Sequence, residues 1–494
     1  MRMYRCFMIL MAMLWLVSAC TTSKQGYNPR KKYPPELLEQ DLRVFRGVLE
    51  QYHPSIYWFT PKDSMDEQFN RLGRSIRDSM TEPEFRNQLQ YILSEIQCGH
   101  TAVLFSKNYV RYLDTALLPV FPLSFKVWPD SMAVTNLIGR PHPLLKRGTI
   151  VYSINGRSTR ELTDTLFHYL VTDGNALIGK YQTLSTRGNF GTLYRSVLGM
   201  PEKLILDIAD STGKRQEIQI KPYQPVKDTS SKKDTARKRP APVPRTMVNP
   251  IRNIQIDTTI SSAYMTLNSF APGNKLRSFF RESFSTIEEN KIKHLVIDVR
   301  SNGGGNAGLS TLLTRYLINK KFKLADTLYA VTRNGDYNRY IKRYWLIRLA
   351  LPFITRKGAD GHYHFRHFER HYYKPKRAHH FDGNVYILTG GNSFSATTLF
   401  AKALKGQQNV TIVGEETGGG SYGNTAWMIP DVELPNTRIR FRLPLFRLVM
   451  DKEAIAEARG VLPDIEVVPT GEDVRKGVDA KVQAVRRLIM NKSK

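Results

Sequence analysis

Residues 390–397 hold two serines, Ser393 and Ser395, between an apolar segment and a segment with helical spacing. A serine at such a turn can act as a nucleophile, because the turn exposes its hydroxyl group and the amino end of the following helix stabilises nearby negative charge. Serine is also one of the preferred N-terminal caps of helices, where its role is structural. The pattern alone leaves these two interpretations equally open.

A second turn lies in HLVIDVRSNGGGNAG, residues 294–308, where an apolar run breaks into three consecutive glycines. Gly303, Gly305 and Gly308 satisfy the G-x-G-x-x-G pattern of dinucleotide-binding loops, which is a weak signal when it stands alone. Glycines also let backbone N–H groups approach a ligand closely, since no Cβ is in the way. The loop therefore indicates an anion site whose ligand the rest of the chain must identify.

The elements that position these turns indicate an α/β fold. Between residues 251 and 470, strand-like apolar runs alternate with helical segments, which is typical of a largely parallel sheet covered by helices. Residues 33–105 carry apolar side chains at helical spacing, and His100 directly follows the last of these helices. A histidine just past a helix end is held in place, and its ordinary pKa suits proton transfer near neutrality. Residues 115–222 consist mainly of short strand-like runs.

The N-terminus indicates export. Arg2 and Arg5 precede an apolar stretch over residues 6–19, which is too short for a permanent membrane span and fits a signal peptide. The small residues before Cys20 resemble a bacterial lipobox, which implies an acyl anchor on that cysteine and a place in the cell envelope, on the periplasmic side of the outer membrane. A generic signal peptide with a chance cysteine is the alternative. Only Cys98 of the three cysteines then stays free, so no internal disulfide is expected.

Charge gives a weaker indication of partners. The formal net charge is +29, and part of it comes from residues 223–250, which are rich in Pro, Ser, Lys and Arg. Such a segment is typical of a solvated linker. It lacks interleaved aromatic residues, so no specific nucleic-acid partner is predicted. An anionic membrane or envelope surface is the expected neighbour. Export also argues against a dinucleotide as the ligand of the glycine loop.

Three motifs together resemble those of the C-terminal processing (tail-specific) and tricorn-core serine peptidases. They are IDVRSNGGG, TGGNSFSATTLFAKAL and VGEETGGG, with RGVLPDIEV close behind. The resemblance implies a ClpP/crotonase-like α/β core that hydrolyses peptide or protein substrates, with no metal or organic cofactor. The predicted parts are a lipoprotein signal peptide (1–19), a tether (20–32), a helical N-terminal domain (33–110), a PDZ-like domain (115–222), a basic Pro-rich linker (223–250), the peptidase core (251–470) and a C-terminal helix (471–494).

The resemblance also assigns roles to residues. The family nucleophile falls on Ser395, and Cys98-Gly99-His100-Thr101 matches the histidine motif of the tricorn-like branch, which makes His100 the general base. Residues 417–420 lack the lysine of the Ser/Lys branch, so a lysine-dependent mechanism is not expected. The alternative for His100 is a helix cap.

The rest of the expected site consists of a carboxylate and an oxyanion hole. A carboxylate should orient the histidine, and by its position before residues 460–464 we predict Glu457, with Glu453 in reserve. The glycine loop is then expected to stabilise a transient oxyanion through the N–H of Gly303 or Gly304, together with that of Ala396.

Two segments and one rival function remain open. Residues 361–380 hold six of the eleven histidines and are interpreted as an exposed basic insertion near the site, with a transition-metal site as the alternative. Residues 343–357, RYWLIRLALPFITRK, fit a membrane-interface segment, a lid or a buried helix. The rival function is non-catalytic binding on the same fold, with lipophilic ligands or envelope polyanions as partners.

Overall fold

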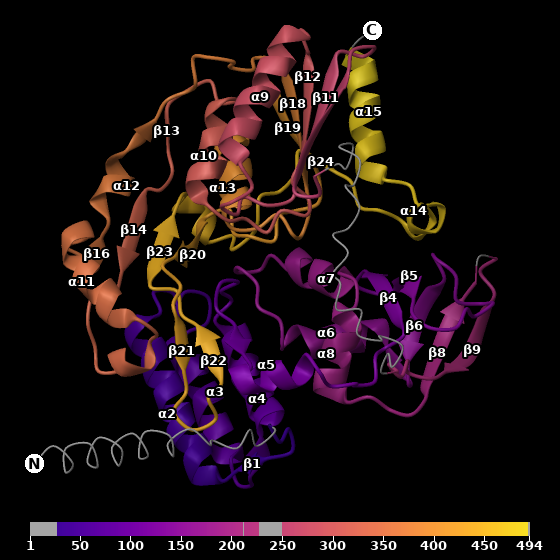
Figure 1. The fold of residues 1–494 in the computed structure, drawn as a ribbon, viewed down its shortest axis with the longest axis vertical. Helices are drawn as coiled ribbons and strands as arrows, with labels where there is room; N and C mark the ends of the chain where they lie inside the picture. Colours follow the sequence, from indigo (N-terminus) through magenta and orange to yellow (C-terminus); the bar gives the residue numbers. More distant parts are fainter. Residues whose placement is uncertain (1–26, 211, 227–248, 493–494) are drawn as a thin grey trace, which may run out of the picture.

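The computed structural model describes residues 27–210, 212–226 and 249–492 (Figure 1). The predicted signal peptide, Cys20 and most of the basic linker lie outside the described residues. The described chain combines helices with several sheets, which confirms the predicted mixed α/β fold class.

The core is a six-stranded sheet of order β10-β11-β12-β18-β19-β24. Its strands run parallel from β11 to β24, whereas β10 pairs with β11 in the antiparallel sense. The central strand β12 is buried along its whole length, as expected for a parallel sheet covered on both faces. The strands are β10 (Arg252–Asp257), β11 (Ser262–Leu267), β12 (His294–Asp298), β18 (Asn384–Thr389), β19 (Val410–Gly414) and β24 (Ile465–Glu466).

Helices cover both faces of this sheet because successive strand residues point to opposite sides. Leu295 and Ile297 of β12 pack with α9 (Leu276–Glu289), α10 (Ala307–Arg315) and α13 (Ala396–Leu404). Val296, between them, packs with α15 (Ala480–Lys492) on the other face. Figure 1 shows α15 and the group α9, α10 and α13 on opposite sides of the sheet.

The C-terminal segment differs from the single helix predicted over 471–494. It forms α14 (Gly471–Lys476) and then α15, and Gly477 between them takes a left-handed φ of 67°. Glycine adopts this conformation at little cost, so it ends α14 and lets the chain turn before α15 begins.

The N-terminal helices share one hydrophobic core with strands from the second half of the chain. Leu38, Phe45 and Phe85 lie in the same buried cluster as Phe441 and Leu448. Thr81 and Glu84 form a capping box, in which the side chain of each accepts the backbone N–H of the other. The helices are α2 (Pro35–Tyr52), α3 (Lys62–Ser75), α4 (Glu82–Glu95) and α5 (Lys107–Leu113), accompanied by the short N-terminal strands β1 (Lys32–Tyr33), β2 (Met80–Thr81) and β3 (Val103–Leu104). The strands from the second half of the chain are β14 (Thr327–Ala330), β20 (Gly423–Trp427), β21 (Asp431–Glu433), β22 (Arg440–Arg442) and β23 (Phe446–Val449).

The middle region has an antiparallel sheet of order β4-β5-β6-β8-β9, with β7 paired to β6. Three helices pack with it, and α7 lies against β4. The elements are β4 (Leu123–Val127), β5 (Met132–Leu137), β6 (Ile150–Ile154), β7 (Arg157–Ser158), α6 (Thr159–Phe167), α7 (Ile178–Ser185), α8 (Asn189–Leu198), β8 (Leu204–Ala209) and β9 (Arg215–Ile220).

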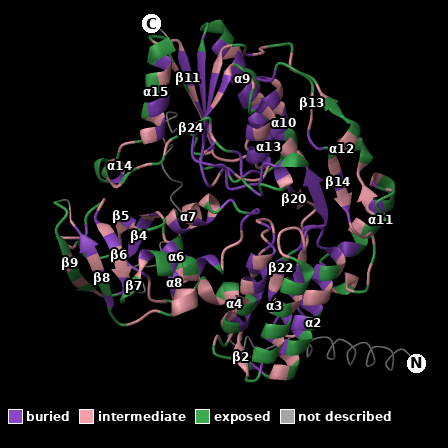
Figure 2. Cartoon of the chain, turned by 180° about the vertical axis from the view of Figure 1, so that it is seen from behind, coloured by how far each residue is buried: buried purple, intermediate pink, exposed green. Residues whose placement is uncertain are grey.

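An insertion over residues 331–383 connects β14 to β18 and lies at the outer edge of the molecule (Figures 1 and 2). Within the described part of the chain, no helix is both long enough and apolar enough to span a membrane. The insertion contains α11 (Tyr344–Ile354), β15 (Arg356–Lys357), β16 (Tyr363–His364), α12 (Arg366–Arg370) and β17 (Tyr372–Tyr373), which pairs with β13 (Phe322–Lys323).

Candidate active site

Ser395 lies in the turn that joins β18 to α13. Its backbone has φ 55° and ψ −121°, in the region that disfavours side chains with a Cβ. Although Ser395 occupies the N-cap position, its side chain makes no capping hydrogen bond. Backbone strain of this kind costs about 1–3 kcal/mol and is concentrated at functional sites. The geometry therefore does not support a role for Ser395 as a simple helix cap.

The neighbouring Ser393 has a structural role. It is fully buried, its hydroxyl donates to the carbonyl of Val299 at 2.9 Å, and its oxygen accepts the N–H of Gly390 at 3.2 Å. These bonds hold the turn to the end of β12. Of the two serines in this turn, only Ser395 keeps its hydroxyl free of hydrogen bonds to other described residues.

The glycine loop after β12 lies directly against Ser395. A Cβ at Gly304 would come within 2.8 Å of both Ser395 Cβ and Phe394 O, and φ at Gly304 is 101°. The loop is held by Phe270, whose N–H donates to Gly304 O at 2.8 Å. The close approach of backbone to backbone explains why glycine is needed here.

The two candidate oxyanion donors of this loop differ. The Gly304 N–H donates to Asn302 Oδ1 at 2.9 Å, so it is already engaged. The Gly303 N–H has no hydrogen-bond partner within the described residues. Ala396 is the first residue of α13, where N–H groups lack intrahelical acceptors. Of the three residues predicted for the oxyanion hole, Gly303 and Ala396 are thus the ones whose N–H groups make no hydrogen bond to another described residue.

A second glycine segment, residues 417–420, packs on the same turn. A Cβ at Gly419 would come within 3.1 Å of Ser395 N, and the Gly419 N–H donates to Ser393 O at 3.4 Å. A Cβ at Gly418 would come even closer to Gly391 O, at 2.1 Å. This segment therefore supports the turn through its backbone and carries no basic side chain.

His100 is brought to this turn from the N-terminal region. Its ring stacks on that of Phe394, with the centroids 4.6 Å apart and an interplanar angle of 28°. Both ring nitrogens are buried and lack hydrogen-bond partners among the described residues. Burial lowers the pKa of His100, Asp173 opposes this shift, and Arg447 and Arg442 lower the pKa further. The lowered pKa favours the neutral imidazole, which is the form that a general base needs.

The carboxylate that acts on His100 is Asp173, from the loop between α6 and α7. It is 3% exposed, and its Oδ1 accepts the Gly99 N–H at 2.7 Å while its Oδ2 accepts that of Gly420 at 3.4 Å. Asp173 thus ties the histidine loop to the glycine segment beside Ser395. Sequence reasoning missed it, since it lies 74 residues from Gly99 in a different region and no motif surrounds it.

The predicted carboxylate Glu457 lies elsewhere. It is exposed in a turn that follows a short 3₁₀ helix (Glu453–Ile455), and its charge acts on Arg459. Glu453 is exposed as well. Neither side chain is among the groups that shift the pKa of His100. The structure places His100 against Phe394, the neighbour of Ser395, and Gly304 against Ser395 and Ala396, whereas Glu457 takes no part in these contacts.

A series of side-chain hydrogen bonds holds the loop that carries His100. Cys98 Sγ lies 2.9 Å from Thr425 Oγ1, and the Thr101 hydroxyl donates to Cys98 Sγ at 3.1 Å. Thr101 Oγ1 is also 2.8 Å from His53 Nε2. All four residues are buried, and Cys98 and Thr101 hold the chain just before and just after His100.

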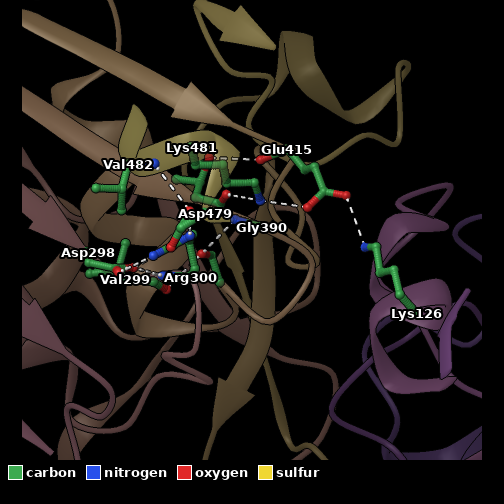
Figure 3. A network of polar contacts seen from close by, with 11 residues as sticks. Lys126, Asp298, Val299, Arg300, Gly390, Glu415, Asp479, Lys481 and Val482 are labelled. Atoms are coloured by element: carbon green, nitrogen blue, oxygen red, sulfur yellow. Dashed lines mark hydrogen bonds and ion pairs between the residues drawn. The ribbon is translucent and has the colours of Figure 1, made fainter. Parts of the chain in front are cut away.

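Charged residues brace the ends of the core strands (Figure 3). Asp298 pairs with Arg300 at 2.6 Å, and Arg300 pairs in turn with Asp479 at 2.8 Å. Burial alone would raise the pKa of Asp298, but Arg300 and the Tyr264 hydroxyl hold it below its usual value. Asp298 is therefore an ionised brace for the glycine loop.

A second group of charged residues links the core to the middle region. Lys481 Nζ lies 2.6 Å from Glu415, and Lys126 of β4 reaches the same carboxylate at 3.5 Å (Figure 3). Burial alone would raise the pKa of Glu415, but the two lysines lower it overall. This group fixes the start of the segment that leads to Gly418–Gly420, and so contributes to the support of Ser395.

A cavity of about 490 Å³ opens at Ser395. Ser395, Asn306 and Asn424 supply polar side chains to its wall, and most of the other side chains that line it are apolar. The apolar lining residues are Leu324, Phe368, Tyr373, Leu399, Trp427, Met428 and Leu448. Such a cavity can hold an apolar side chain next to the serine hydroxyl.

The histidine-rich insertion forms local contacts. His362 stacks on Tyr329 with centroids 4.5 Å apart, and His364 lies between Asp360 and Glu369 at 3.0 and 2.7 Å. In the part of the chain that the structure describes, no group of three or more His, Cys, Asp or Glu side chains is arranged to hold a metal ion.

Comparisons with known proteins agree with this geometry. Residues 261–467 match peptidase family S41. Two solved structures of mature CPAF, one complexed with lactacystin, share the fold at 14% and 15% identity. The first covers 92% of this chain and 98% of its own with a TM-score of 0.63, and the second covers 93% and 99% with a TM-score of 0.60. A sequence comparison with curated proteins found no match. Residues 261–467 are thus a peptidase family S41 domain, which confirms the resemblance and makes the chain a serine-type peptidase.

Proposed function

We propose that this S41 peptidase is an exported, lipid-anchored enzyme that hydrolyses peptide bonds with Ser395 as nucleophile and His100 as general base. One observation carries the proposal: Ser395 stands in a strained turn without a capping bond, and its neighbour Phe394 stacks on the ring of His100, whose nitrogens have no hydrogen-bond partner among the described residues. The anchor rests on the sequence pattern before Cys20.

The reaction follows from the free groups of the site. His100 takes the proton of the Ser395 hydroxyl as its oxygen attacks the peptide carbonyl, which forms a tetrahedral intermediate. The N–H groups of Gly303 and Ala396 stabilise the oxyanion, since of the predicted donors only that of Gly304 bonds to another described residue. His100 then protonates the leaving amine as the C–N bond breaks, which leaves the acyl group bound to Ser395 as an ester. His100 next takes a proton from a water molecule that attacks this ester, and returns it to Ser395 as the acyl group leaves.

Asp173 supports the histidine in this scheme. As His100 gains a proton, the nearby carboxylate stabilises the imidazolium through the charge interaction that raises its pKa. Asp173 also holds the backbone of Gly99, so it fixes the histidine loop. We therefore assign the supporting role to Asp173 in place of Glu457.

The apolar cavity at Ser395 suggests which substrates are used. Its lining of Phe368, Trp427, Met428 and other apolar residues suits an apolar side chain at the residue whose carbonyl is attacked. The preferred substrates are then peptides with an apolar residue on the acyl side of the cleaved bond.

A peptide-cleavage experiment tests the proposal. The purified protein is incubated with a peptide mixture, and the products are identified by mass spectrometry. We expect cleavage after apolar residues, reduced about 10⁴-fold or more in Ser395→Ala and in His100→Ala. Ser278→Ala, on α9, is the matched control and should cleave like the wild type. If all four proteins cleave alike, or none cleaves any peptide, the proposal is wrong and non-catalytic binding becomes the better account.

A further inference from the structure

The helix α11 presents an apolar face to solvent. Its inward face follows the spacing of Tyr344, Ile347, Leu351 and Ile354, and packs on the cluster that contains the N-terminal helices. Figure 2 shows α11 at the outer edge of the molecule, coloured largely as exposed. The sequence had left a buried helix as one alternative for residues 343–357, and the structure does not support it. The outward apolar residues are Trp345 (64% exposed), Leu346 (47%), Leu349 (63%) and Phe353 (84%).

These side chains form one continuous stripe. Trp345, Leu349 and Phe353 are four residues apart, so they lie above one another on the same side of the helix. Single apolar residues on a surface are common, whereas a contiguous stripe of large ones marks an interaction surface. No described residue covers this stripe.

Basic residues surround the stripe. Lys342 and Arg343 precede it, Arg348 lies within it, and Arg356 and Lys357 follow it, all of them exposed. None of the five forms an ion pair with another described residue. Residues 337–358 contain no Asp or Glu. An exposed apolar helix face flanked by unpaired cations is typical of helices that lie in the interface of anionic membranes.

We propose that α11 docks onto an anionic phospholipid surface. The stripe would enter the boundary between headgroups and acyl chains, and the flanking Lys and Arg side chains would contact the lipid phosphates. A protein partner or a second copy of the chain could also cover an apolar stripe. The unpaired cations on both sides favour anionic headgroups over either of these.

The position of α11 gives this contact a consequence for the enzyme. The insertion that carries α11 also carries Phe368 and Tyr373, which line the cavity at Ser395. A docked helix would hold the mouth of that cavity close to the lipid surface. This consequence rests on the proposed function, whereas the docking itself does not.

Vesicle sedimentation tests the docking. The chain is produced from Thr21 onward, because the predicted signal segment would insert by itself and the described structure begins at Tyr27. We expect the protein to pellet with phosphatidylcholine vesicles that contain one quarter phosphatidylglycerol. It should pellet weakly with phosphatidylcholine alone, and binding should fall as salt screens the lipid charge.

A pair of double variants locates the contact. Leu349→Ser with Phe353→Ser should lower the partition onto the anionic vesicles about tenfold or more, since it removes the centre of the stripe. Ile205→Ser with Met490→Ser removes two exposed apolar side chains elsewhere and should bind like the wild type. Both double variants should cleave soluble peptides as the wild type does, which separates this test from that of the proposed function.

Three results would overturn the docking proposal. The first is no binding of the wild type to either kind of vesicle. The second is equal binding by both double variants. The third is a change of oligomeric state in the Leu349/Phe353 variant, measured by analytical ultracentrifugation without lipid, which would identify the stripe as an interface between copies of the chain.

Discussion

Gly304 provides a sharp test of how the glycine loop positions the nucleophile. The change Gly304→Ala places a Cβ 2.8 Å from Ser395 Cβ, 2.8 Å from Phe394 O and 3.0 Å from Ala396 N. Ordinary contacts between such atoms are about 3.5–4.0 Å, so the loop and the turn must separate by roughly 0.7–1 Å. The residue also sits at φ 101°, where an alanine is strained by about 1–3 kcal/mol.

The expected result is a large loss of activity with a smaller loss of stability. A displacement of about 1 Å between reacting groups can cost about 100-fold in rate, so we expect kcat/KM for peptide cleavage to fall by about 100-fold or more. The free energy of unfolding should fall by about 1–3 kcal/mol, measured by urea titration at 25 °C. The protein would still be folded, so the loss of rate reports on the position of Ser395.

The adjacent glycine supplies the control. A Cβ at Gly303 would meet no atom within 4 Å, and its φ is not in the left-handed region. Alanine at Gly303 also keeps the backbone N–H that we assign to the oxyanion hole. We expect Gly303→Ala to retain activity within a few-fold of the wild type. Equal activities for the two variants, or wild-type activity in Gly304→Ala, would refute the contact between loop and nucleophile.

Three further predictions follow from the same geometry. Because the pKa of His100 lies below its usual value, kcat/KM should fall only as the pH drops through this lowered pKa. Asp173 raises the pKa of His100, so Asp173→Asn should move the fall in kcat/KM to still lower pH. A pH profile that does not move would contradict the interaction between Asp173 and His100. Lys481→Met leaves the buried Glu415 with only Lys126 as a charged partner at 3.5 Å, so the free energy of unfolding at pH 7 should fall by about 3 kcal/mol in a urea titration. A loss below about 1 kcal/mol would show that the contact between Lys481 and Glu415 is dispensable. Ser393→Ala loses two buried hydrogen bonds, which should lower the melting temperature in a thermal scan. The variant should still react at Ser395 with a fluorophosphonate probe for activated serines, and complete loss of this reaction in folded Ser393→Ala would reassign the nucleophile.

Local features of this chain could be predicted from sequence because they depend on neighbouring residues. The alternation of apolar runs and helical spacing indicated β18 and α13, and with them the turn that carries Ser395. The Thr81–Glu84 capping box is likewise local, since it joins residues only three positions apart. The glycines of the loop after β12 indicated a close backbone approach, which the structure places at Ser395.

Features that depend on contacts between distant segments could not be predicted. Asp173 reaches Gly99 from the middle region, and its local sequence gives no sign of that contact. The shared core of the N-terminal helices and β14, β22 and β23 joins residues several hundred positions apart. The orientation of α11 was also undetermined, because its mixture of apolar and basic residues fits several environments, and only the exposure of its outer face in the described structure decides among them.

The central claim is that His100 activates Ser395, and labelling with a fluorophosphonate probe tests it most directly. The probe reacts with activated serines, and mass spectrometry of the digested protein identifies the modified residue. We predict an adduct on Ser395 in the wild type, none in Ser395→Ala, and a labelling rate reduced about 100-fold or more in His100→Ala. Labelling of another residue, or an unchanged rate in His100→Ala, would contradict the account.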